Sequence, residues 1–353
     1  MKTQLKPNLI EMKILFFSLL LLIFTTVSNA NDGYKLWLQY HTIENPSEWQ
    51  KDCLGHYLIN GSSTTLDIID NEIQKASLGF FKKVANKDTN NTKLIISKVS
   101  DLDSQKFPLD AVKITDLGSE GFFIQEFEGD SEDKTTIITA NTDLGLLYGT
   151  FHLLQKIQKN ETIPAEGVFQ SPKTQHRLLN HWDNLDRTVE RGYSGFSIWN
   201  WHRLPRHIDQ QYIDYARANA SIGINGTVLT NVNANSLVLT PEYLEKVKAL
   251  ADTFRPYGIK VYLTARFSSP IEIGGIKTAD PLDKEVQNWW NEKAKEVYDY
   301  IPDFGGFVVK ADSEGQPGPH NYGRTQADGA NMLADAVAPF GGIVMWRAFV
   351  YSE

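Results

Sequence analysis

Hydrophobic and polar positions change rhythm about halfway along the chain, after Pro172. From there, short apolar runs alternate with amphipathic helical patterns. The apolar runs predict strands at Arg177–Leu179, Gly226–Leu229, Ile259–Leu263, Phe307–Val309 and Ile343–Met345. The segments between them predict helices near Ile208–Ala220, Pro241–Tyr257, Lys284–Tyr300 and Thr325–Val337. This βα repetition is typical of a parallel sheet with crossover helices.

Polar and aromatic residues follow each predicted strand directly. They lie at residues 180–184, 230–235, 266–269, 310–314 and 346–349. In a β/α barrel the carboxyl ends of all strands meet at one mouth, so five such clusters favour a barrel with a site there. The mixture of aromatic, amide and cationic side chains suits a sugar ligand. A doubly wound sheet is the alternative, and it is weakened because no GxGxxG follows the first strand.

One stretch, FGGFVVKADSEGQPGP at Phe304–Pro319, carries the strongest chemical signal. Its apolar run has the character of a buried parallel strand, and Lys310, Asp312 and Glu314 come immediately after it. Glycines and prolines then force a loop. A barrel presents a catalytic acid in this way, although a strand end with a solvated Asp and Glu has the same pattern.

The part before the barrel predicts a small α/β accessory domain at residues 31–160, without a nucleophile–base pair or a phosphate-binding loop. We expect strands at Tyr34–Tyr40, Lys93–Val99, Gly121–Phe127 and Thr135–Thr139, and helices at Glu72–Phe81 and Leu144–Ile157. The acidic segment Glu126–Asp133 is interpreted as a hairpin turn and not as a metal site. Asn160–Pro172 has the Pro and Gly content of a linker, so residues 161–353 form the second domain.

Residues 1–30 have the pattern of a signal peptide. Ile14–Phe24 is an apolar run of the right length, and Ser28 and Ala30 are small residues at a cleavage site. Met12 is an alternative start, and an uncleaved anchor is the alternative interpretation. We expect an exported protein, periplasmic or extracellular, with no membrane association after cleavage.

Composition excludes several classes of function. The 353-residue chain has a formal net charge of −8 and no long basic run, which argues against a nucleic-acid partner. Cys53 is the single cysteine, so an internal disulfide and a cysteine-cluster metal site are excluded. The eight histidines show no HExxH spacing. We therefore expect no metal site.

Two long motifs resemble those of one family. RLLNHWDNLDRTVERGYSGFSIWNW at Arg177–Trp201 and KADSEGQPGP at Lys310–Pro319 closely resemble the α-glucuronidases of glycoside hydrolase family 67, and the small first domain and MWRAFVY also fit. The resemblance implies a (β/α)₈ barrel without a cofactor. It further implies removal of (4-O-methyl)-α-D-glucuronic acid, with inversion, from the non-reducing end of glucuronoxylan-derived aldouronic acids.

The resemblance also implies roles for five residues. Glu314 falls on the general acid, whose pKa must be raised for this chemistry; Asp312 would help to raise it and Lys310 would oppose this. Lys310 and Arg347 fall on residues that bind the glucuronate carboxylate, Trp182 on an aromatic wall of the sugar site, and Val232 on the pocket for the 4-O-methyl group. A structural ion pair and plain core packing are the alternatives for the cations and for Trp182. Asp183 and Asn184 are expected to orient the first loop.

The chain departs from the family at its end. The family's base carboxylates lie on later strands, so we expect a TIM barrel truncated after about five βα units and lacking the general base. An inactive fragment or weak uronic-acid binder is therefore one alternative function. A hexosaminidase-like glycosidase is another, although Ser313 separates Asp312 from Glu314. A homodimer is expected only for the full-length protein, through the family's C-terminal region, so the sequence leaves the oligomeric state open.

Overall fold

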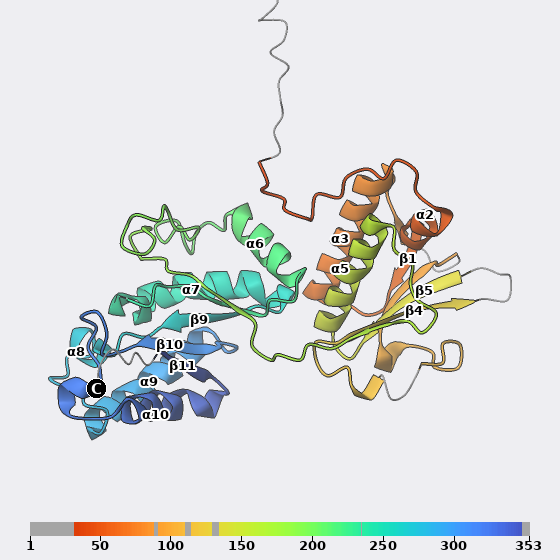
Figure 1. Ribbon diagram of the computed structural model, residues 1–353. Coiled ribbons are helices and arrows are strands. Elements are labelled where there is room, and N and C mark those ends of the chain that lie inside the picture. The colour runs from red at the N-terminus through yellow and green to blue at the C-terminus, as the bar shows by residue number, and fades with distance from the viewer. Residues whose placement is uncertain (1–31, 88–90, 110–113, 129–133, 234, 348–353) are drawn as a thin grey trace, which may run out of the picture. The chain divides into compact units, whose positions relative to one another are not determined.

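A computed structural model describes residues 32–87, 91–109, 114–128, 134–233 and 235–347 (Figure 1). The described residues divide into two units, with the boundary between Gln39 and Tyr40. In the first unit, the strand predicted over Tyr34–Tyr40 is wrong, because Gly33 and Leu36 have positive φ angles and residues 34–37 form turns. The Asp32 carboxylate accepts a hydrogen bond from the Tyr34 amide at 2.9 Å, which favours this turn over a strand.

The second unit contains a six-stranded mixed sheet in the order β2-β1-β3-β5-β4-β6. Its strands are β1 (His56–Ile59), β2 (Asn86–Lys87), β3 (Leu94–Lys98), β4 (Phe122–Glu128), β5 (Lys134–Ala140) and β6 (Val168–Gln170). β4 runs antiparallel to β5, as expected for strands flanking a hairpin turn, while residues 129–133 of that turn lie outside the described residues. β6 pairs with β4, so the predicted linker contributes an edge strand to this sheet.

Three helices accompany the first sheet: α2 (Glu48–Gly55), α3 (Thr64–Phe81) and α5 (Asp143–Lys159). Figure 1 shows α3 and α5 side by side against one face of the sheet. Ser63 and Thr142 begin these two helices by accepting hydrogen bonds from the Leu66 and Gly145 amides. Cys53 of α2 is 1% exposed, and burial raises the pKa of its thiol to about 12.

The second sheet has five parallel strands in chain order, β7-β8-β9-β10-β11. They are β7 (Leu178–Asn180), β8 (Gly226–Val228), β9 (Lys260–Thr264), β10 (Gly306–Lys310) and β11 (Ile343–Arg347). The intervening helices are α6 (Gln210–Ala220), α7 (Pro241–Phe254), the short α8 (Ser269–Glu272), α9 (Lys284–Tyr300) and α10 (Gln326–Val337). Parallel strands in sequential order with crossover helices are the pattern of a β/α barrel, so the predicted fold class, five βα units of TIM-barrel type after a small α/β domain, is confirmed.

Alternate residues of these strands lie on opposite faces of the sheet. Val228, Tyr262 and Val308 form an apolar cluster together with Val232 on the inner face. Phe307 packs edge-on against Trp290 of α9, with 6.1 Å between ring centroids. Burial on both faces explains why these strands have continuous apolar runs in the sequence. No helix among the described residues is long and apolar enough to cross a membrane.

Candidate active site

The site predicted from sequence lies where the strands of the second sheet end. β10 and β11 pair so that Lys310 and Arg347, their last residues, are register partners on neighbouring parallel strands. Two cationic side chains therefore leave the sheet side by side. Lys310 is 2% exposed, and a buried ammonium is stable only with compensating acceptors.

Trp182 and Val232 belong to the same end of the sheet. The Arg347 guanidinium lies 5.5 Å from the Trp182 ring centroid, a cation–π contact. Trp182 also packs against the apolar cluster that contains Val232, which is 2% exposed. The indole thus joins the cationic pair to the apolar interior, and Val232 offers little free surface in this structure.

Glu314 and Asn233 supply acceptors for the Lys310 ammonium. The Lys310 ammonium donates to Asn233 Oδ1 at 3.0 Å, and it forms an ion pair with the Glu314 carboxylate. The structure therefore brings all five predicted residues into one connected group. Their roles in catalysis stay predictions.

The Glu314 carboxylate stands at the solvent edge of this group. Its side chain is 47% exposed, and Arg191 Nη2 lies 3.2 Å from Oε1 while Lys310 contacts Oε2. Hydrogen bonding to Lys310, followed by the charge of Arg191, holds the pKa of Glu314 below its usual value. A general acid needs a raised pKa, whereas the contacts of Glu314 in this structure favour its ionised form.

Asp312 is not among the groups that shift the pKa of Glu314, contrary to the expectation from sequence. Its carboxylate accepts from Gln326 Nε2 at 2.7 Å and from the His320 amide at 3.3 Å. Gln326 in turn accepts from the indole of Trp346 at 2.6 Å. Asp312 therefore ties the loop after β10 to α10 and β11.

The first loop is held as predicted by Asp183 and Asn184. Asp183 is 5% exposed and accepts a hydrogen bond from Ser197 Oγ at 2.6 Å. Asn184 Nδ2 donates to the Glu190 carbonyl oxygen at 2.8 Å, and Asn231 Nδ2 donates to Asn184 Oδ1 at 3.1 Å. These bonds confirm that both residues orient the loop.

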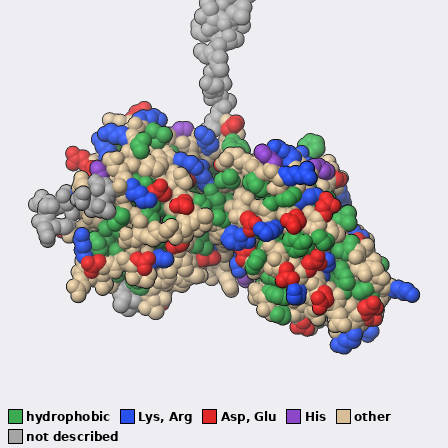
Figure 2. Space-filling model, turned by 180° about the vertical axis from the view of Figure 1, so that it is seen from behind, with side chains coloured by type: hydrophobic (Ala, Val, Ile, Leu, Met, Phe, Trp, Pro, Cys, Tyr) green, Lys and Arg blue, Asp and Glu red, His purple; other side chains and the backbone are tan. Residues whose placement is uncertain are grey.

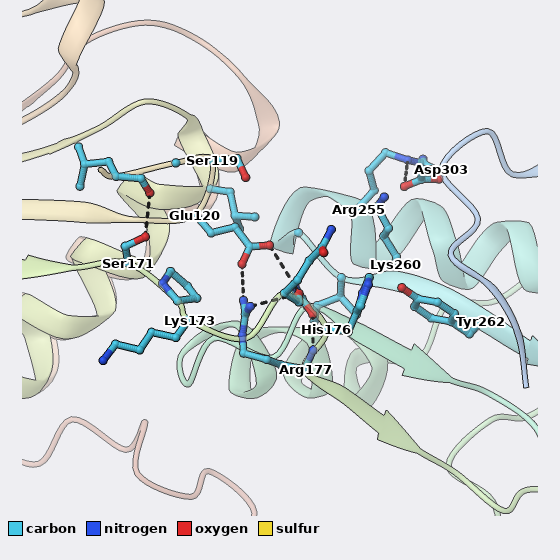
Figure 3. Close-up of a pocket in the computed structure, with 18 residues that line it drawn as sticks. Ser119, Glu120, Ser171, Lys173, His176, Arg177, Arg255, Lys260, Tyr262 and Asp303 are labelled. Carbon is cyan, nitrogen blue, oxygen red and sulfur yellow. Dashed lines mark hydrogen bonds and ion pairs between the residues drawn. The ribbon is translucent and has the colours of Figure 1, made fainter. Parts of the chain in front are cut away.

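Cavities open at both ends of the second sheet. One of about 260 Å³ adjoins the predicted site and is lined by carboxylate, amide and hydroxyl side chains such as Asp186, Thr230 and Asn233. A larger one of about 570 Å³ lies at the amino ends of the strands (Figure 3). In Figure 3 four of its charged residues form two ion pairs, Glu120 with Arg177 and Arg255 with Asp303. The smaller cavity is the one that belongs with the predicted chemistry, because it lies where the strands end.

The charges of the described residues do not indicate a metal ion or a polyanion. Among the described residues, no group of three His, Cys, Asp or Glu side chains is arranged to hold a metal ion. On the face seen in Figure 2, basic and acidic side chains are interspersed and form no extended basic patch.

Two contacts of the site were missed from the sequence. Asn233 lies within the amide-rich cluster that follows β8, which was the available signal, although no single residue stood out. Arg191 lies within the Arg177–Trp201 motif, but nothing in the sequence indicates that it pairs with Glu314, 123 residues later in the chain. Only the folded loop after β7 brings the two together.

Comparison with known proteins gives a consistent result. A model of the glycosyl hydrolase family 67 N-terminus matches residues 36–153, and a model of the family's middle domain matches residues 156–353. Alpha-glucuronidase A of Emericella nidulans is 36% identical over 96% of this chain and 40% of its own length. Probable alpha-glucuronidase A of Aspergillus niger (CBS 513.88) has the same identity and coverage. The chain therefore spans about 40% of the length of these curated relatives.

A solved structure shares the fold. A family 138 glycoside hydrolase targeting pectin rhamnogalacturonan II superposes with a TM-score of 0.54, at 16% identity, over 81% of this chain and 33% of that one. At this identity the likeness concerns the arrangement of helices and strands alone.

Proposed function

The chain belongs to glycosyl hydrolase family 67, and from that premise we propose that it acts as an α-glucuronidase on acidic oligosaccharides derived from glucuronoxylan. The curated relatives carry the name alpha-glucuronidase A, which supports the class of substrate. The observation that carries the proposal is the pair of neighbouring cations, Lys310 and Arg347, with the Glu314 carboxylate four residues after Lys310. A uronic acid needs cationic partners for its carboxylate, and cleavage of its glycosidic bond needs an acid.

In the proposed reaction, the sugar carboxylate binds Lys310 and Arg347 while the Trp182 indole supports one face of the ring. A proton passes from Glu314 to the glycosidic oxygen, and the bond between that oxygen and C1 breaks. Water adds to C1 from the opposite face and loses its proton to a second carboxylate, which produces inversion. The sequence assigns no residue to this second carboxylate. A 4-O-methyl group would lie toward Val232.

The ion pair between Lys310 and Glu314 has a consequence for the proposed reaction. Lys310 contacts Glu314 now, and a bound glucuronate would compete for the same ammonium. Once Lys310 is shared with the sugar carboxylate, the pKa of Glu314 rises toward the value that proton donation requires. The substrate's own carboxylate thus prepares the acid, and a neutral sugar would not.

The test is glucuronic acid release from an aldouronic acid by the purified chain, with the anomer followed by NMR. Release of the β-anomer supports an inverting α-glucuronidase. Binding of glucuronic acid without release supports the alternative of a weak uronic-acid binder. If the chain neither bound nor released glucuronic acid, the proposal would be contradicted.

A hexosaminidase-like activity fits the geometry less well. Such enzymes use adjacent Asp and Glu side chains, whereas Ser313 separates Asp312 from Glu314 and the Asp312 carboxylate is bonded to Gln326. Cleavage of an N-acetylhexosaminide, with no effect on a glucuronide, would favour that class instead.

We also propose export through the apolar segment Ile14–Phe24, which lies outside the described residues. Cleavage after Ala30 is the expected processing step. N-terminal sequencing of the protein recovered from the producing cells would test it, since an intact leader would contradict export with cleavage.

A further inference from the structure

The loop after β7 carries two aromatic side chains that the proposed reaction does not use. Phe196 is 82% exposed and Tyr193 is 75% exposed, more than any other large apolar side chain among the described residues. Two aromatic rings exposed on one short loop are unusual for a surface that binds nothing.

The base of this loop is firmly held. The Ser197 amide donates to the Arg187 carbonyl oxygen at 2.8 Å, and Thr188 and Phe196 form an isolated antiparallel bridge. The Glu190 amide donates to the Trp182 carbonyl oxygen at 2.8 Å, which links the loop to the proposed sugar wall. The two rings are therefore presented from an anchored support.

Glycines on either side shape the tip. Gly192 and Gly195 have φ angles of +93° and +92°, a conformation that side-chain-bearing residues rarely adopt. Nothing lies within 4 Å of the position that a Cβ atom would take at either glycine. The backbone angle, and not crowding, therefore selects glycine at both places, and the resulting turns carry Tyr193 and Phe196 out into solvent.

Arg191, at the start of this tip, contacts Glu314 and so links the tip to the proposed site of glycosidic bond cleavage. It contacts Oε1 of Glu314, while Lys310 contacts Oε2. In the proposed reaction Lys310 marks the side of the glucuronate, and the acid lies beside the oxygen that leaves with the rest of the oligosaccharide. The loop arrives on the Oε1 side of Glu314, and the proposed reaction puts the leaving group on that side.

We propose that Tyr193 and Phe196 form an aromatic platform for the xylosyl residues of the leaving group; this inference rests on the proposed function. Xylose has no exocyclic CH₂OH group, so its ring offers flat C–H surfaces that pack on aromatic faces. The platform binds the neutral xylan backbone and leaves recognition of the acid group to Lys310 and Arg347. It makes the protein select acidic sugars attached to a xylo-oligosaccharide over free uronic acids.

The experiment uses isothermal titration calorimetry on the whole chain with three probes: glucuronic acid, xylotriose, and an aldotetraouronic acid that joins the two. The Tyr193→Ala/Phe196→Ala double variant is compared with the unmodified chain. We expect about tenfold weaker binding of the aldotetraouronic acid, corresponding to ~1.4 kcal/mol, with glucuronic acid binding unchanged. The conservative Tyr193→Phe/Phe196→Tyr variant should bind like the unmodified chain.

The matched control is Phe169→Ala, which removes a ring that is 36% exposed on β6 of the other sheet. It should change none of the three affinities. Thermal unfolding and size-exclusion chromatography of each variant identify a loss of folding or a change of oligomeric state. A change of oligomeric state would mean that the rings cover an interface between copies, and it would overturn the platform.

The outcomes separate this inference from the proposed function. Unchanged aldotetraouronic acid binding in the double variant overturns the platform, as does an equal loss for glucuronic acid. Suppose that the unmodified chain binds xylotriose but not glucuronic acid, and that the double variant no longer binds xylotriose. This result supports the platform and contradicts the glucuronidase function. If the unmodified chain binds none of the three probes, both the platform and the proposed glucuronidase function are contradicted.

Discussion

The two ends of the second sheet hold their charges in different ways. At the amino ends, the Arg177 guanidinium pairs with Glu120 and donates to the Thr174 and Gly223 carbonyl oxygens at 2.6 Å each, while Glu120 also accepts from Asn225 at 3.0 Å. At the carboxyl ends, the ammonium of Lys310 is buried but its carboxylate partner is 47% exposed.

The comparison separates structural from functional charge. The network around Arg177 has little surface left for a ligand, because its donors already have acceptors within the protein. The Lys310–Glu314 pair reaches solvent through Glu314, so we expect a ligand anion to compete with that carboxylate for the Lys310 ammonium. The larger cavity therefore lies beside the structural network, and the chemistry lies at the opposite end.

The largest expected effect is on turnover. In a form of the protein that hydrolyses aldouronic acids, Glu314→Gln removes the proton donor and should lower kcat by about 10²- to 10⁴-fold. The affinity for glucuronic acid should persist, because Lys310 and Arg347 remain. Glu120→Gln at the other end is the matched control and should keep full turnover. A normal rate in Glu314→Gln would remove Glu314 from the mechanism.

Binding of the acid group should depend on Lys310. Lys310→Met keeps an unbranched side chain and removes the charge, and it should weaken glucuronic acid binding roughly 10- to 100-fold, the range for a charged hydrogen bond. Calorimetry with glucuronic acid and with glucose measures this effect, since glucose lacks the carboxylate. Lys260→Met, at the first residue of β9, is the control at the amino end. If Lys310→Met left the affinity for glucuronic acid intact, the carboxylate site would have to lie elsewhere.

The stability of the fold should depend on the ion pair at the amino ends of the strands. Glu120→Gln removes the anionic partner of Arg177, and we expect the free energy of unfolding to fall by about 1–2 kcal/mol. Urea unfolding measures this change, and glucuronic acid binding to the folded variant should be unaltered. A loss of ligand affinity without a loss of stability would contradict the division between the two ends.

The smallest expected effect concerns pH. Because Lys310 and then Arg191 lower the pKa of Glu314 in the folded protein, Lys310→Met and Arg191→Gln should each raise it, Lys310→Met by more. The lowered pKa means that the pair stabilises the fold above the unfolded-state pKa, and that this contribution is lost as pH falls through the folded-state pKa. Exposure and salt keep it small. The ¹³C carboxyl shift of Glu314 against pH measures the titration, and a pKa unmoved by both changes would contradict the ion pairs.

Much of the barrel was predictable because its signals are local. Apolar runs followed by polar clusters located all five strands, and the observed bounds differ from the predicted ones by one or two residues. The helix at Lys284–Tyr300 agrees at both ends, where Asp283 begins the helix by accepting from the Glu285 amide at 2.8 Å. Long amphipathic patterns with clear caps reflect interactions between residues a few positions apart, which the sequence displays directly.

The first sheet was less predictable because its pairing is not local. The strand β1 and the helix α2 were missed, since each is short and has little periodicity. β6 lies in a segment with the composition of a linker, and only its bonds to β4 make it a strand. Short edge strands depend on a partner distant in the chain, so their own residues carry a weak signal.

The sequence by itself determined the βα rhythm, the buried strand that ends at Lys310, and the residue types at the carboxyl ends of the strands, because each depends on neighbours along the chain. Only the tertiary structure decided that Arg191 reaches Glu314, that Asp312 turns toward Gln326, and that the pKa of Glu314 falls and does not rise. Electrostatic interactions act through space and decline with distance, so the state of a carboxylate depends on which charges the fold brings within a few ångströms of it.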